Sequence, residues 1–461
     1  MTEIRLFNTL TNKEEVLKTI DPNHLKLYVC GPTVYDRPHL GNARSVVIYD
    51  LFFRFFKAVF PQVTYVRNIT DVDDKINAAA KEQNIPIQEL TQKIIDIFYQ
   101  DISALNVLRP TFEPRATNHI ADMIVMIQKL IENKNAYESH GHVLFNVESY
   151  KNYGELSNRN LDEMIAGSRV EVATYKKNPL DFVLWKPANL GDDSSSIFES
   201  PWGKGRPGWH IECSAMSSKY LGENFDIHGG GADLQFPHHE NEIAQSRCAN
   251  VGSSYAKLWV HNGFLTVNGE KMSKSLKNFI TVRDLLNQGV SGIVIRYLLL
   301  SSHYRKPLDF SQKALQDAQK SIEKFYAVLN LNEVKPTAAA PQEILDYLAD
   351  DLNLSKAFAA LHEMAKNLKS QKNKNLLETF TTTLDFLGLL DFNWKPHQKN
   401  LKPSQEEIDE NFINSQIELR LKFKQEKNFL KADEIRKNLL LEGIVLEDNK
   451  DKTIWKKSEN F

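Results

Sequence analysis

The stretch that decides the fold is Leu25-Lys26-Leu27-Tyr28-Val29-Cys30-Gly31-Pro32-Thr33-Val34-Tyr35-Asp36-Arg37-Pro38-His39-Leu40-Gly41-Asn42. Its apolar beginning at 25–30 predicts a buried strand, and a helix is expected from about 43 to 60 after an intervening loop. A second strand at 63–67 makes strands alternate with helices, which indicates a parallel α/β sheet. Such sheets bind nucleotides beyond the carboxyl ends of their strands, where the loop would lie with the positive end of the helix facing a phosphate.

Composition indicates an ordinary soluble globular protein. The chain has 461 residues and a formal net charge of −2, and at about 150 residues per domain we expect roughly three domains. This charge balance neither requires nor excludes binding to a nucleic acid. Three cysteines (Cys30, Cys213 and Cys248) form no disulfide framework and indicate a reducing compartment. With no signal-peptide pattern and no membrane-spanning segment, we expect a cytoplasmic protein without a membrane partner.

Four residues, Cys30, Cys213, His238 and Glu242, could form one zinc site. His238 and Glu242 lie four apart, so on a helix they share one face. Zinc accepts thiolate, imidazole and carboxylate ligands, but cysteines this scattered follow no spacing rule. The residues alone therefore leave open a surface helix carrying His and Glu, with two buried cysteines elsewhere.

A second motif lies at 264–275, in the run Phe-Leu-Thr-Val-Asn-Gly-Glu-Lys-Met-Ser-Lys-Ser. Asn268-Gly269 predicts a tight hairpin turn, which places Lys271 and Lys274 on a mobile loop. Two ammonium groups on such a loop can reach the same polyphosphate and stay close to it as negative charge develops in the transition state. Most lysine pairs in loops are merely solvated, but the complete run downstream of His39-Leu40-Gly41-Asn42 favours the phosphate interpretation.

In the rest of the chain, the expected secondary structure changes at two places. Charged helices and a hairpin-like segment at 141–147 occupy about 113–203, which indicates an insertion between two halves of the sheet. Beyond residue 310 strand signals vanish, and amphipathic helical patterns cover 342–370 and 407–441.

The segments at 39–42 and 271–275 resemble the two signatures of the class I aminoacyl-tRNA synthetases. Further blocks, at 28–36, 67–76, 208–214 and 226–234, narrow the resemblance to the cysteinyl-tRNA synthetase family. The blocks follow in family order, and matches at 431–436 and 443–448 carry the resemblance nearly to the end of the chain.

The resemblance implies a Rossmann-like parallel-sheet catalytic domain with an inserted connective domain, followed by a mainly helical C-terminal tRNA-binding region. The expected domains are the first catalytic half at 1–115, the connective domain at 116–204, the second catalytic half at 205–260, the lysine-loop region and stem-contact fold at 261–315, a helical bundle at 316–400 and a small anticodon-binding domain at 401–461.

The resemblance also implies the activity. L-cysteine and ATP would form cysteinyl-adenylate and pyrophosphate, and the cysteine would then pass to the 3′-terminal adenosine of tRNA(Cys). One zinc ion, held by Cys30, Cys213, His238 and Glu242, would bind the substrate as a thiolate, so that serine is rejected without an editing domain. Mg2+ is expected with ATP, and the family suggests a monomer.

Individual roles follow from the same resemblance. The residues expected to be catalytic are His39, Lys271 and Lys274. Those expected to bind ATP are His39, Gly41, Asn42, Gly229, Gly230, Gly231, Lys271 and Lys274. Those expected to bind the amino acid are Cys30, Thr70, Trp209, His228 and Asp233. Core packing is the alternative for Trp209 and His228. Asn42 stands where the class signature has a second histidine, so it offers only an amide.

Four residues are candidates for anticodon contacts: Lys424, Phe429, Asp433 and Asp448. The mixture of cations and aromatic rings suits phosphate contacts and base stacking, but it also suits an ordinary amphipathic helix with a solvated basic face. Phe429 stands where many relatives carry an indole, so any stacking there would use a smaller ring.

Two other functions are consistent with parts of the sequence. A cysteine ligase with a small amine acceptor would share the catalytic core, but it would need no long C-terminal extension. A non-catalytic, zinc-containing tRNA-binding protein would not need His39, Lys271 and Lys274.

Overall fold

The computed structural model describes residues 3–159, 173–189, 192–272, 278–329, 335–337, 339–371, 373–395, 410–425, 428, 431–433, 435–436, 439, 444–448 and 453–457. The chain divides into two compact units, Met1–Lys395 and Pro396–Phe461. Each unit is described by itself.

A four-stranded, fully parallel sheet forms the centre of the first unit, with strand order β10-β9-β3-β4. Its strands are β3 (His24–Val29), β4 (Gln62–Arg67), β9 (Asn224–Gly231) and β10 (Tyr255–Asn262). The parallel α/β sheet expected from the sequence is therefore confirmed. The strand order reverses between β3 and β9, and the crevice beyond such a switch point is where open α/β sheets bind ligands.

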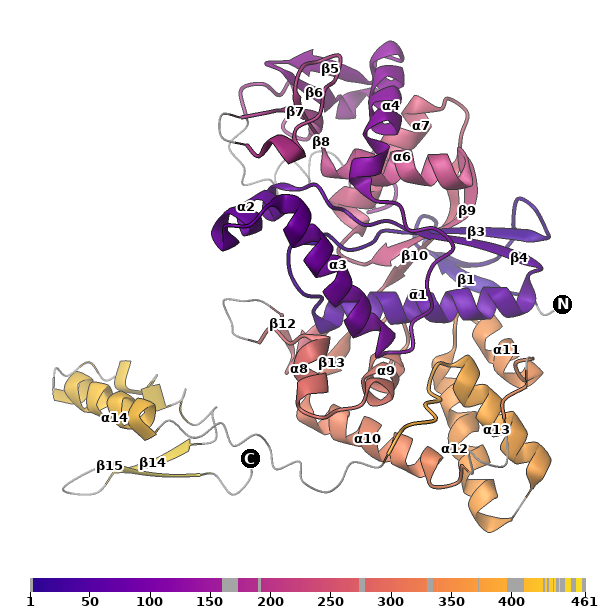
Figure 1. Ribbon diagram of the computed structural model, residues 1–461, viewed down its shortest axis with the longest axis vertical. Coiled ribbons are helices and arrows are strands. Elements are labelled where there is room, and N and C mark those ends of the chain that lie inside the picture. The colour runs from indigo at the N-terminus through magenta and orange to yellow at the C-terminus, as the bar shows by residue number, and fades with distance from the viewer. Residues whose placement is uncertain are drawn as a thin grey trace. The chain divides into compact units, whose positions relative to one another are not determined.

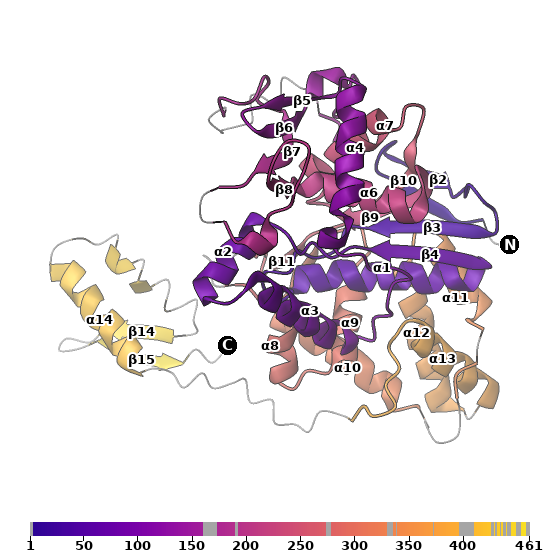
Figure 2. The ribbon, with the colours of Figure 1, turned by 45° about the horizontal axis from the view of Figure 1, so that its top comes forward.

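Helices cover both faces of this sheet (Figures 1 and 2). Helix α1 (Leu40–Val59) lies on one face, and α4 (Ile120–Glu132), α6 (Trp209–Leu221) and α7 (Glu240–Ala249) lie on the other. Leu27 joins the core on the α1 side and Tyr28 joins the core on the opposite side. Burial on both faces is why the strand at 25–30 reads as a nearly continuous apolar run.

An insertion separates β4 from α6 along the chain. It begins with α2 (Asp74–Gln83) and α3 (Ile87–Ser103), and after α4 it forms an antiparallel sheet. That sheet contains β5 (Ala136–Ser139), β6 (His142–Phe145), β7 (Phe182–Pro187) and β8 (Gly205–Pro207). The hairpin expected at 141–147 lies a few residues earlier, as β5–β6 at 136–145, and it turns at His140 and Gly141, whose φ angles are +49° and +76°.

The lysine motif begins in a second hairpin, made by β11 (Leu265–Val267) and β12 (Glu270–Lys271). Asn268 and Gly269 have φ angles of +50° and +81°, as a tight turn of this sequence requires. Strand β13 (Leu308–Phe310) pairs with β11 in parallel. The turn chemistry predicted from Asn268-Gly269 is confirmed.

Helices make up the remainder of the first unit. They are α8 (Val282–Asn287), α9 (Gly292–Leu300), α10 (Gln312–Tyr326), α11 (Gln342–Ala349), α12 (Leu354–Ser370) and α13 (Lys374–Phe386). The helical pattern at 342–370 is broken into α11 and α12, because Asp351 and Leu352 adopt positive φ angles. Short elements are β1 (Arg5–Asn8), β2 (Lys13–Val16), η1 (Ala116–His119), η2 (Val147–Ser149), η3 (Ser194–Ser196) and η4 (Gln235–His239).

The second unit contains α14 (Glu410–Gln425) and an antiparallel hairpin of β14 (Ile444–Asp448) and β15 (Thr453–Lys457). The expectation that no strand follows residue 310 is therefore wrong. Ile417 of the helix and Leu446 of the hairpin share a small apolar core, so each element buries the apolar face of the other. In the part of the chain that the structure describes, no helix is long and apolar enough to cross a bilayer.

Candidate active site

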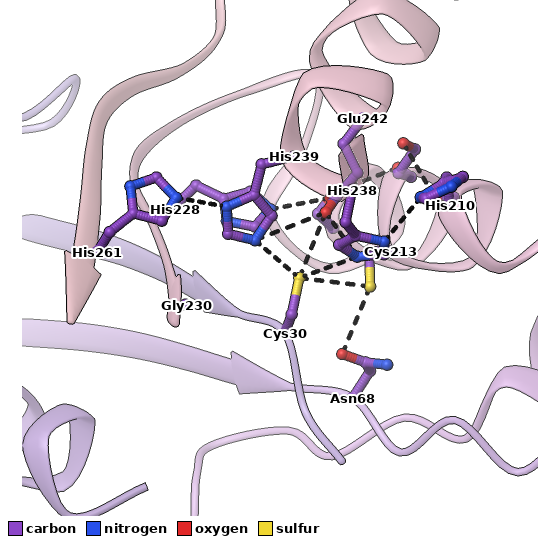
Figure 3. Close-up of polar contacts among 12 residues, drawn as sticks. Cys30, Asn68, His210, Cys213, His228, Gly230, His238, His239, Glu242 and His261 are labelled. Carbon is purple, nitrogen blue, oxygen red and sulfur yellow. Dashed lines mark hydrogen bonds and ion pairs between the residues drawn. The ribbon is translucent and has the colours of Figure 1, made fainter. Parts of the chain in front are cut away.

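Cys30, Cys213, His238 and Glu242 meet at one point beyond the carboxyl end of β3 (Figure 3). The Cys30 sulfur lies 3.6 Å from the Cys213 sulfur, 3.4 Å from His238 Nε2 and 3.3 Å from Glu242 Oε1. His238 Nε2 lies 3.0 Å from Glu242 Oε1. Three of the four side chains are almost completely buried, and only Cys30 is partly accessible.

These spacings suit a tetrahedral metal ion. With ligand bonds of about 2.0 to 2.3 Å, neighbouring ligand atoms in such a site lie roughly 3.3 to 3.8 Å apart. The separations measured around Cys30 fall in that range, and the His238–Glu242 separation of 3.0 Å is slightly shorter. Two sulfurs, an imidazole nitrogen and a carboxylate oxygen are also a donor set that zinc accepts.

The local chain path differs from the prediction for His238. Helix α7 begins only at Glu240, and His238 lies in the preceding turn η4. The two side chains still meet, because the turn leads directly into the helix and Glu242 lies in its first turn.

A second group, Cys30, His228, His239 and Glu242, is also close enough to hold a metal ion. His239 Nε2 lies 3.3 Å from the Cys30 sulfur but 3.9 Å from Glu242 Oε1. Its Nδ1 is 2.7 Å from His261 Nε2. The first group has the more even spacing, so we favour it.

A second layer of side chains orients the possible ligands. Glu242 Oε2 lies 2.9 Å from His228 Nε2 and accepts a 2.9 Å hydrogen bond from the Tyr255 hydroxyl. His238 Nδ1 lies 2.9 Å from His210 Nδ1. Outer contacts of this kind fix the orientation of metal ligands. Tyr255 and His210 were not predicted from the sequence, and no spacing signal could have identified Tyr255, which lies on a different element from Glu242.

Burial, hydrogen bonds and neighbouring charges shift the pKa values of the side chains in this cluster strongly. Burial raises the pKa of Cys213, but hydrogen bonds involving Cys30 and His238 outweigh this effect and bring it to about 6. Burial lowers the pKa of His238, yet the Glu242 charge and hydrogen bonds to Cys213 and Glu242 raise it to about 10. Burial and the neighbouring Cys213 raise the pKa of Cys30. A metal would therefore bind in competition with protons.

Asn68 lies beside both cysteines, because its Oδ1 is 3.6 Å from the Cys213 sulfur and also contacts Gly31, the residue after Cys30. Gly31 N donates to Asn68 Oδ1 at 2.8 Å, and a Cβ at Gly31 would lie only 1.7 Å from the Asn68 carbonyl oxygen. Asn68 Nδ2 donates to the Thr70 hydroxyl at 3.2 Å, and that hydroxyl donates to the buried Glu212 at 2.7 Å. Neither Asn68 nor Glu212 was predicted from the sequence as part of the site.

A cleft of about 360 Å³ opens in front of this cluster. Of the residues predicted to bind substrates, it is lined by Cys30, His39, Gly41, Asn42, Trp209, Gly231, Asp233 and Lys271. The predicted metal site and the predicted phosphate site therefore share one cleft. Lys274 and Phe429 lie outside the described residues.

Two of the predicted ATP contacts, Gly229 and Gly230, lie buried within β9 rather than in the cleft lining. A Cβ at Gly229 would lie 2.4 Å from the Tyr49 ring, and one at Gly230 would lie 2.7 Å from the His239 ring. In this structure the missing side chains make room for those rings. Contact of Gly229 and Gly230 with ATP stays a prediction.

Thr70 and His228, predicted to bind the amino acid, are also buried behind the cleft. His228 stacks on the Trp259 ring, with centroids 4.4 Å apart, and its Nε2 lies 2.9 Å from Glu242 Oε2. Trp209 is 38% exposed and stacks on His238, with centroids 4.1 Å apart. Trp209 thus links the cleft to the buried cluster.

His39 caps the first turn of α1 with its side chain. Its Nδ1 accepts hydrogen bonds from the backbone nitrogens of Gly41 at 3.0 Å and Asn42 at 3.2 Å. Burial lowers the His39 pKa. A neutral ring that accepts at Nδ1 carries its proton on Nε2, so it can donate to a phosphate.

Asn42 completes this cap from the other side. Its side-chain oxygen accepts a 3.2 Å hydrogen bond from the His39 backbone nitrogen, which makes a reciprocal capping box. An amide is therefore sufficient for this contact, and no ionised group is required at position 42.

In the second unit, two of the predicted anticodon residues contact each other. Arg420, whose side chain is 1% exposed, donates to both Asp448 oxygens at 2.8 and 2.9 Å. Lys424 donates to Asp448 at 2.9 Å, and Asp433 is exposed. Asp448 thus joins α14 to β14, and base contacts by Lys424, Asp433 and Asp448 stay predictions.

Comparisons with known proteins agree with this picture. The family described as "tRNA synthetases class I (C) catalytic domain" matches residues 16–320. A cysteine–tRNA ligase of Rickettsia felis is 52% identical over 463 residues, covering 99% of each chain. One of a Wolbachia strain from Drosophila simulans is 51% identical over 461 residues, covering 98% of this chain and 99% of the relative.

The solved structure of Mycobacterium tuberculosis methionyl-tRNA synthetase in complex with methionyl-adenylate is similar with a TM-score of 0.54. It is 15% identical and the match covers 79% of this chain and 89% of that one, so this likeness concerns the fold alone.

Proposed function

This chain belongs to the class I aminoacyl-tRNA synthetases, and within them to the cysteine–tRNA ligases, and from that premise we propose how its own residues carry out the reaction. The observation that carries the proposal is the shared cleft, which is lined by Cys30 from the thiol-rich cluster and by His39 and Lys271 from the two signature motifs.

The reaction has two steps. A carboxylate oxygen of cysteine attacks the α-phosphorus of ATP, and the bond to the β-phosphate breaks to release pyrophosphate. A ribose hydroxyl of the terminal adenosine of tRNA then attacks the acyl carbon, and AMP leaves. Neither step needs a covalent bond to the protein, so positioning and charge stabilisation supply the catalysis.

The first step needs positive groups where charge moves from the α-phosphate to pyrophosphate. His39 donates from Nε2, because its Nδ1 is already committed to the start of α1. The positive end of α1 acts in the same direction. Lys271, at the end of β12, and Lys274 would neutralise the leaving phosphates.

The donor set Cys30, Cys213, His238 and Glu242 fits zinc, as the separations of 3.0 to 3.6 Å among its atoms support. Bound zinc would lower the pKa of a coordinating thiol, so that substrate cysteine binds as a thiolate and the hydroxyl of serine is rejected. The chain itself holds these ligands in place through His210, Tyr255 and His228.

Several finer assignments belong to the same proposal. Mg2+ would accompany ATP, the chain would act as a monomer in the cytoplasm, and the six domain ranges expected from the sequence would apply. The second unit would contact the anticodon of tRNA(Cys), and Lys424 and Asp433 offer exposed or partly exposed polar groups for this role.

The test is ATP–pyrophosphate exchange with cysteine or with serine, on protein whose zinc content is measured. We expect exchange with cysteine only, and its loss in Cys213→Ala while the fold persists. Cys248→Ala is the matched control, because Cys248 is buried but outside the cluster. Equal exchange with serine would overturn the thiolate mechanism.

A second assay separates the proposal from its rivals. Charging of tRNA(Cys) with labelled cysteine is expected from the intact chain. Exchange without charging would favour a small amine acceptor, and zinc-loaded protein that does neither would favour a non-catalytic tRNA-binding protein.

A further inference from the structure

Asp101 is a buried carboxylate near the end of α3 that the proposed reaction does not use. Two arginines from distant segments share it. Arg283, on α8, donates from Nε to Asp101 Oδ1 at 2.9 Å, and its Nη2 lies 2.7 Å from the same oxygen. Arg37 Nη1 lies 3.5 Å from the other oxygen, Oδ2. Because a charge is costly to bury alone, Asp101 needs at least one of these partners.

The two arginines hold Asp101 unequally. Arg283 makes two short contacts, whereas among the described residues neither Asp101 Oδ2 nor Arg37 Nη1 makes a hydrogen bond, although both atoms are buried. Buried polar atoms without a hydrogen bond are rare, and each calls for an explanation. Arg37 also lines the cleft, and its side chain is 36% exposed. Arg283 therefore neutralises Asp101, and the longer contact with Arg37 needs a reason other than stability.

The two arginines flank the two motifs predicted to bind phosphate. Arg37 precedes His39 by two residues. Arg283 lies in the first turn of α8, the helix that follows the lysine motif. Helices α3 and α8 lie next to each other in both views (Figures 1 and 2). One carboxylate on α3 is thus in contact with a segment beside each motif.

The same two segments are also joined by their backbones. Leu40 N donates to the Ile280 carbonyl at 3.0 Å, and His39 and Thr281 form an isolated antiparallel bridge. The His39 ring meets the Phe279 ring edge-on, with centroids 5.1 Å apart. The position of His39 relative to the segment after the lysine motif therefore depends on this joint.

We propose that Asp101 is a positioning residue for the activation of the amino acid, a proposal that rests on the proposed function. Held by Arg283, its carboxylate sets the position of Arg37, and with it the loop that presents His39. We call these three side chains, Arg37, Asp101 and Arg283, the Asp101 clasp. Asp101 acts through geometry alone, because it is fully buried and is not part of the cleft lining.

The expected effect follows from the precision that catalysis requires. A displacement of about 1 Å, caused by a change far from the chemistry, can cost about 100-fold in rate. Loss of the Asp101 clasp should therefore lower the kcat of ATP–pyrophosphate exchange by roughly 10- to 100-fold. A displaced His39 acts on the transition state more than on ATP binding, so the KM for ATP should stay within about twofold.

The first experiment uses Arg37→Met, which removes the charge and keeps an apolar stem. Arg37→Lys is the rescue variant, because it keeps a cation. Arg109→Met is the matched control, since Arg109 Nη1 lies 3.6 Å from Glu113 Oε2 and Arg109 is not part of the cleft lining. For each protein we would measure the melting temperature, and kcat and the KM for ATP in pyrophosphate exchange.

We expect a lower kcat in Arg37→Met, partial recovery in Arg37→Lys and wild-type values in Arg109→Met. A raised KM for ATP in Arg37→Met, with or without a lower kcat, would show that Arg37 binds ATP directly. A kcat within twofold of wild type would show that the contact with Asp101 positions nothing. Either result would overturn the proposal.

A double-mutant cycle tests whether Arg37 acts through Asp101. Asp101→Asn and Arg37→Met should each lower kcat, and the double variant should lose no more than the more damaging single variant, because both changes break one contact. Losses that multiply would mean that the two residues act independently, which would contradict the proposal.

Amide hydrogen exchange reads the Asp101 clasp without the reaction. The Leu40 amide, which bonds to the Ile280 carbonyl, should exchange faster in Arg37→Met than in wild type, while the amides of β3 stay unchanged. Equal protection of Leu40 in both proteins would refute the clasp. This measurement decides the matter even if Asp101→Asn does not fold. It also applies if wild-type protein shows no pyrophosphate exchange, a result that would count against the proposed function instead.

Discussion

The hydroxyl of Tyr255 offers the sharpest test of how the chain orients its proposed metal ligands. Tyr255 is 1% exposed and its hydroxyl donates to Glu242 Oε2 at 2.9 Å. The other oxygen, Oε1, faces Cys30 and His238. Tyr255→Phe removes only the hydroxyl and keeps the ring, so the change acts on the carboxylate with little effect on packing.

Two estimates give similar magnitudes. A hydrogen bond to a charged group contributes about 1.5–3 kcal/mol, which is roughly 10- to 150-fold in an equilibrium constant. Loss of a contact that orients a metal ligand typically weakens metal binding by about 10- to 100-fold. Ser217 also contacts the lost hydroxyl, but it retains a 3.1 Å hydrogen bond to the Ser214 carbonyl. We therefore expect zinc affinity to fall by about 10- to 100-fold.

The assay is competition for zinc between the protein and a chelator of known affinity, at constant pH. Tyr220→Phe is the control, because the Tyr220 hydroxyl lies 3.3 Å from His119 Nε2, outside the cluster. Zinc affinity of Tyr255→Phe within threefold of wild type would refute the reasoning, as would an equal loss in the control.

Three further predictions follow from individual contacts. Asp448→Asn should destabilise the second unit by about 2–3 kcal/mol, because it leaves the charge of the buried Arg420 without a partner. The effect is smaller than for a fully buried pair, because the Asp448 side chain is one-third exposed to solvent. Unchanged hydrogen exchange in β14 would contradict this. Gly31→Ala should abolish zinc binding and exchange, because its methyl group would lie 1.7 Å from the Asn68 carbonyl oxygen, and a fully active variant would disprove that close packing. Burial holds the pKa of His39 in the folded protein below 6.5. The neutral ring therefore contributes its full share to the free energy of unfolding above about pH 6.5, and this share is lost as the pH falls through the folded pKa. The exchange rate should decline on the same acid limb, because a protonated Nδ1 cannot cap α1, whereas an acid limb with its midpoint above pH 6.5 would count against this role for His39.

Local sequence chemistry predicted the elements that depend on near neighbours. The strand at 25–30 was predictable because a strand buried on both faces must be apolar at nearly every position. The hairpin that begins the lysine motif was predictable because Asn268-Gly269 tolerates the positive φ angles of its turn. The break at Asp351 and Leu352 was not predicted, since leucine rarely adopts a positive φ angle and a single aspartate is a weak signal for one.

The C-terminal hairpin also escaped prediction. Ile444 and Leu446 alternate with less buried positions, but a five-residue strand carries too few positions to outweigh the helical pattern before it. Packing against Ile417 of α14 is what gives this short pattern its stability.

The sequence could identify the residues of the candidate site, but it could not supply the distances between them. The sequence by itself determined which donors are present, namely Cys30, Cys213, His238 and Glu242, and that two motifs predicted to bind phosphate accompany them. Only the tertiary structure decided that these donors meet, because the order of β3 and β9 in the sheet brings distant segments to one edge. Tyr255 follows the same physical rule: its contact with Glu242 depends on how α7 packs against β10, and no local pattern encodes that distance.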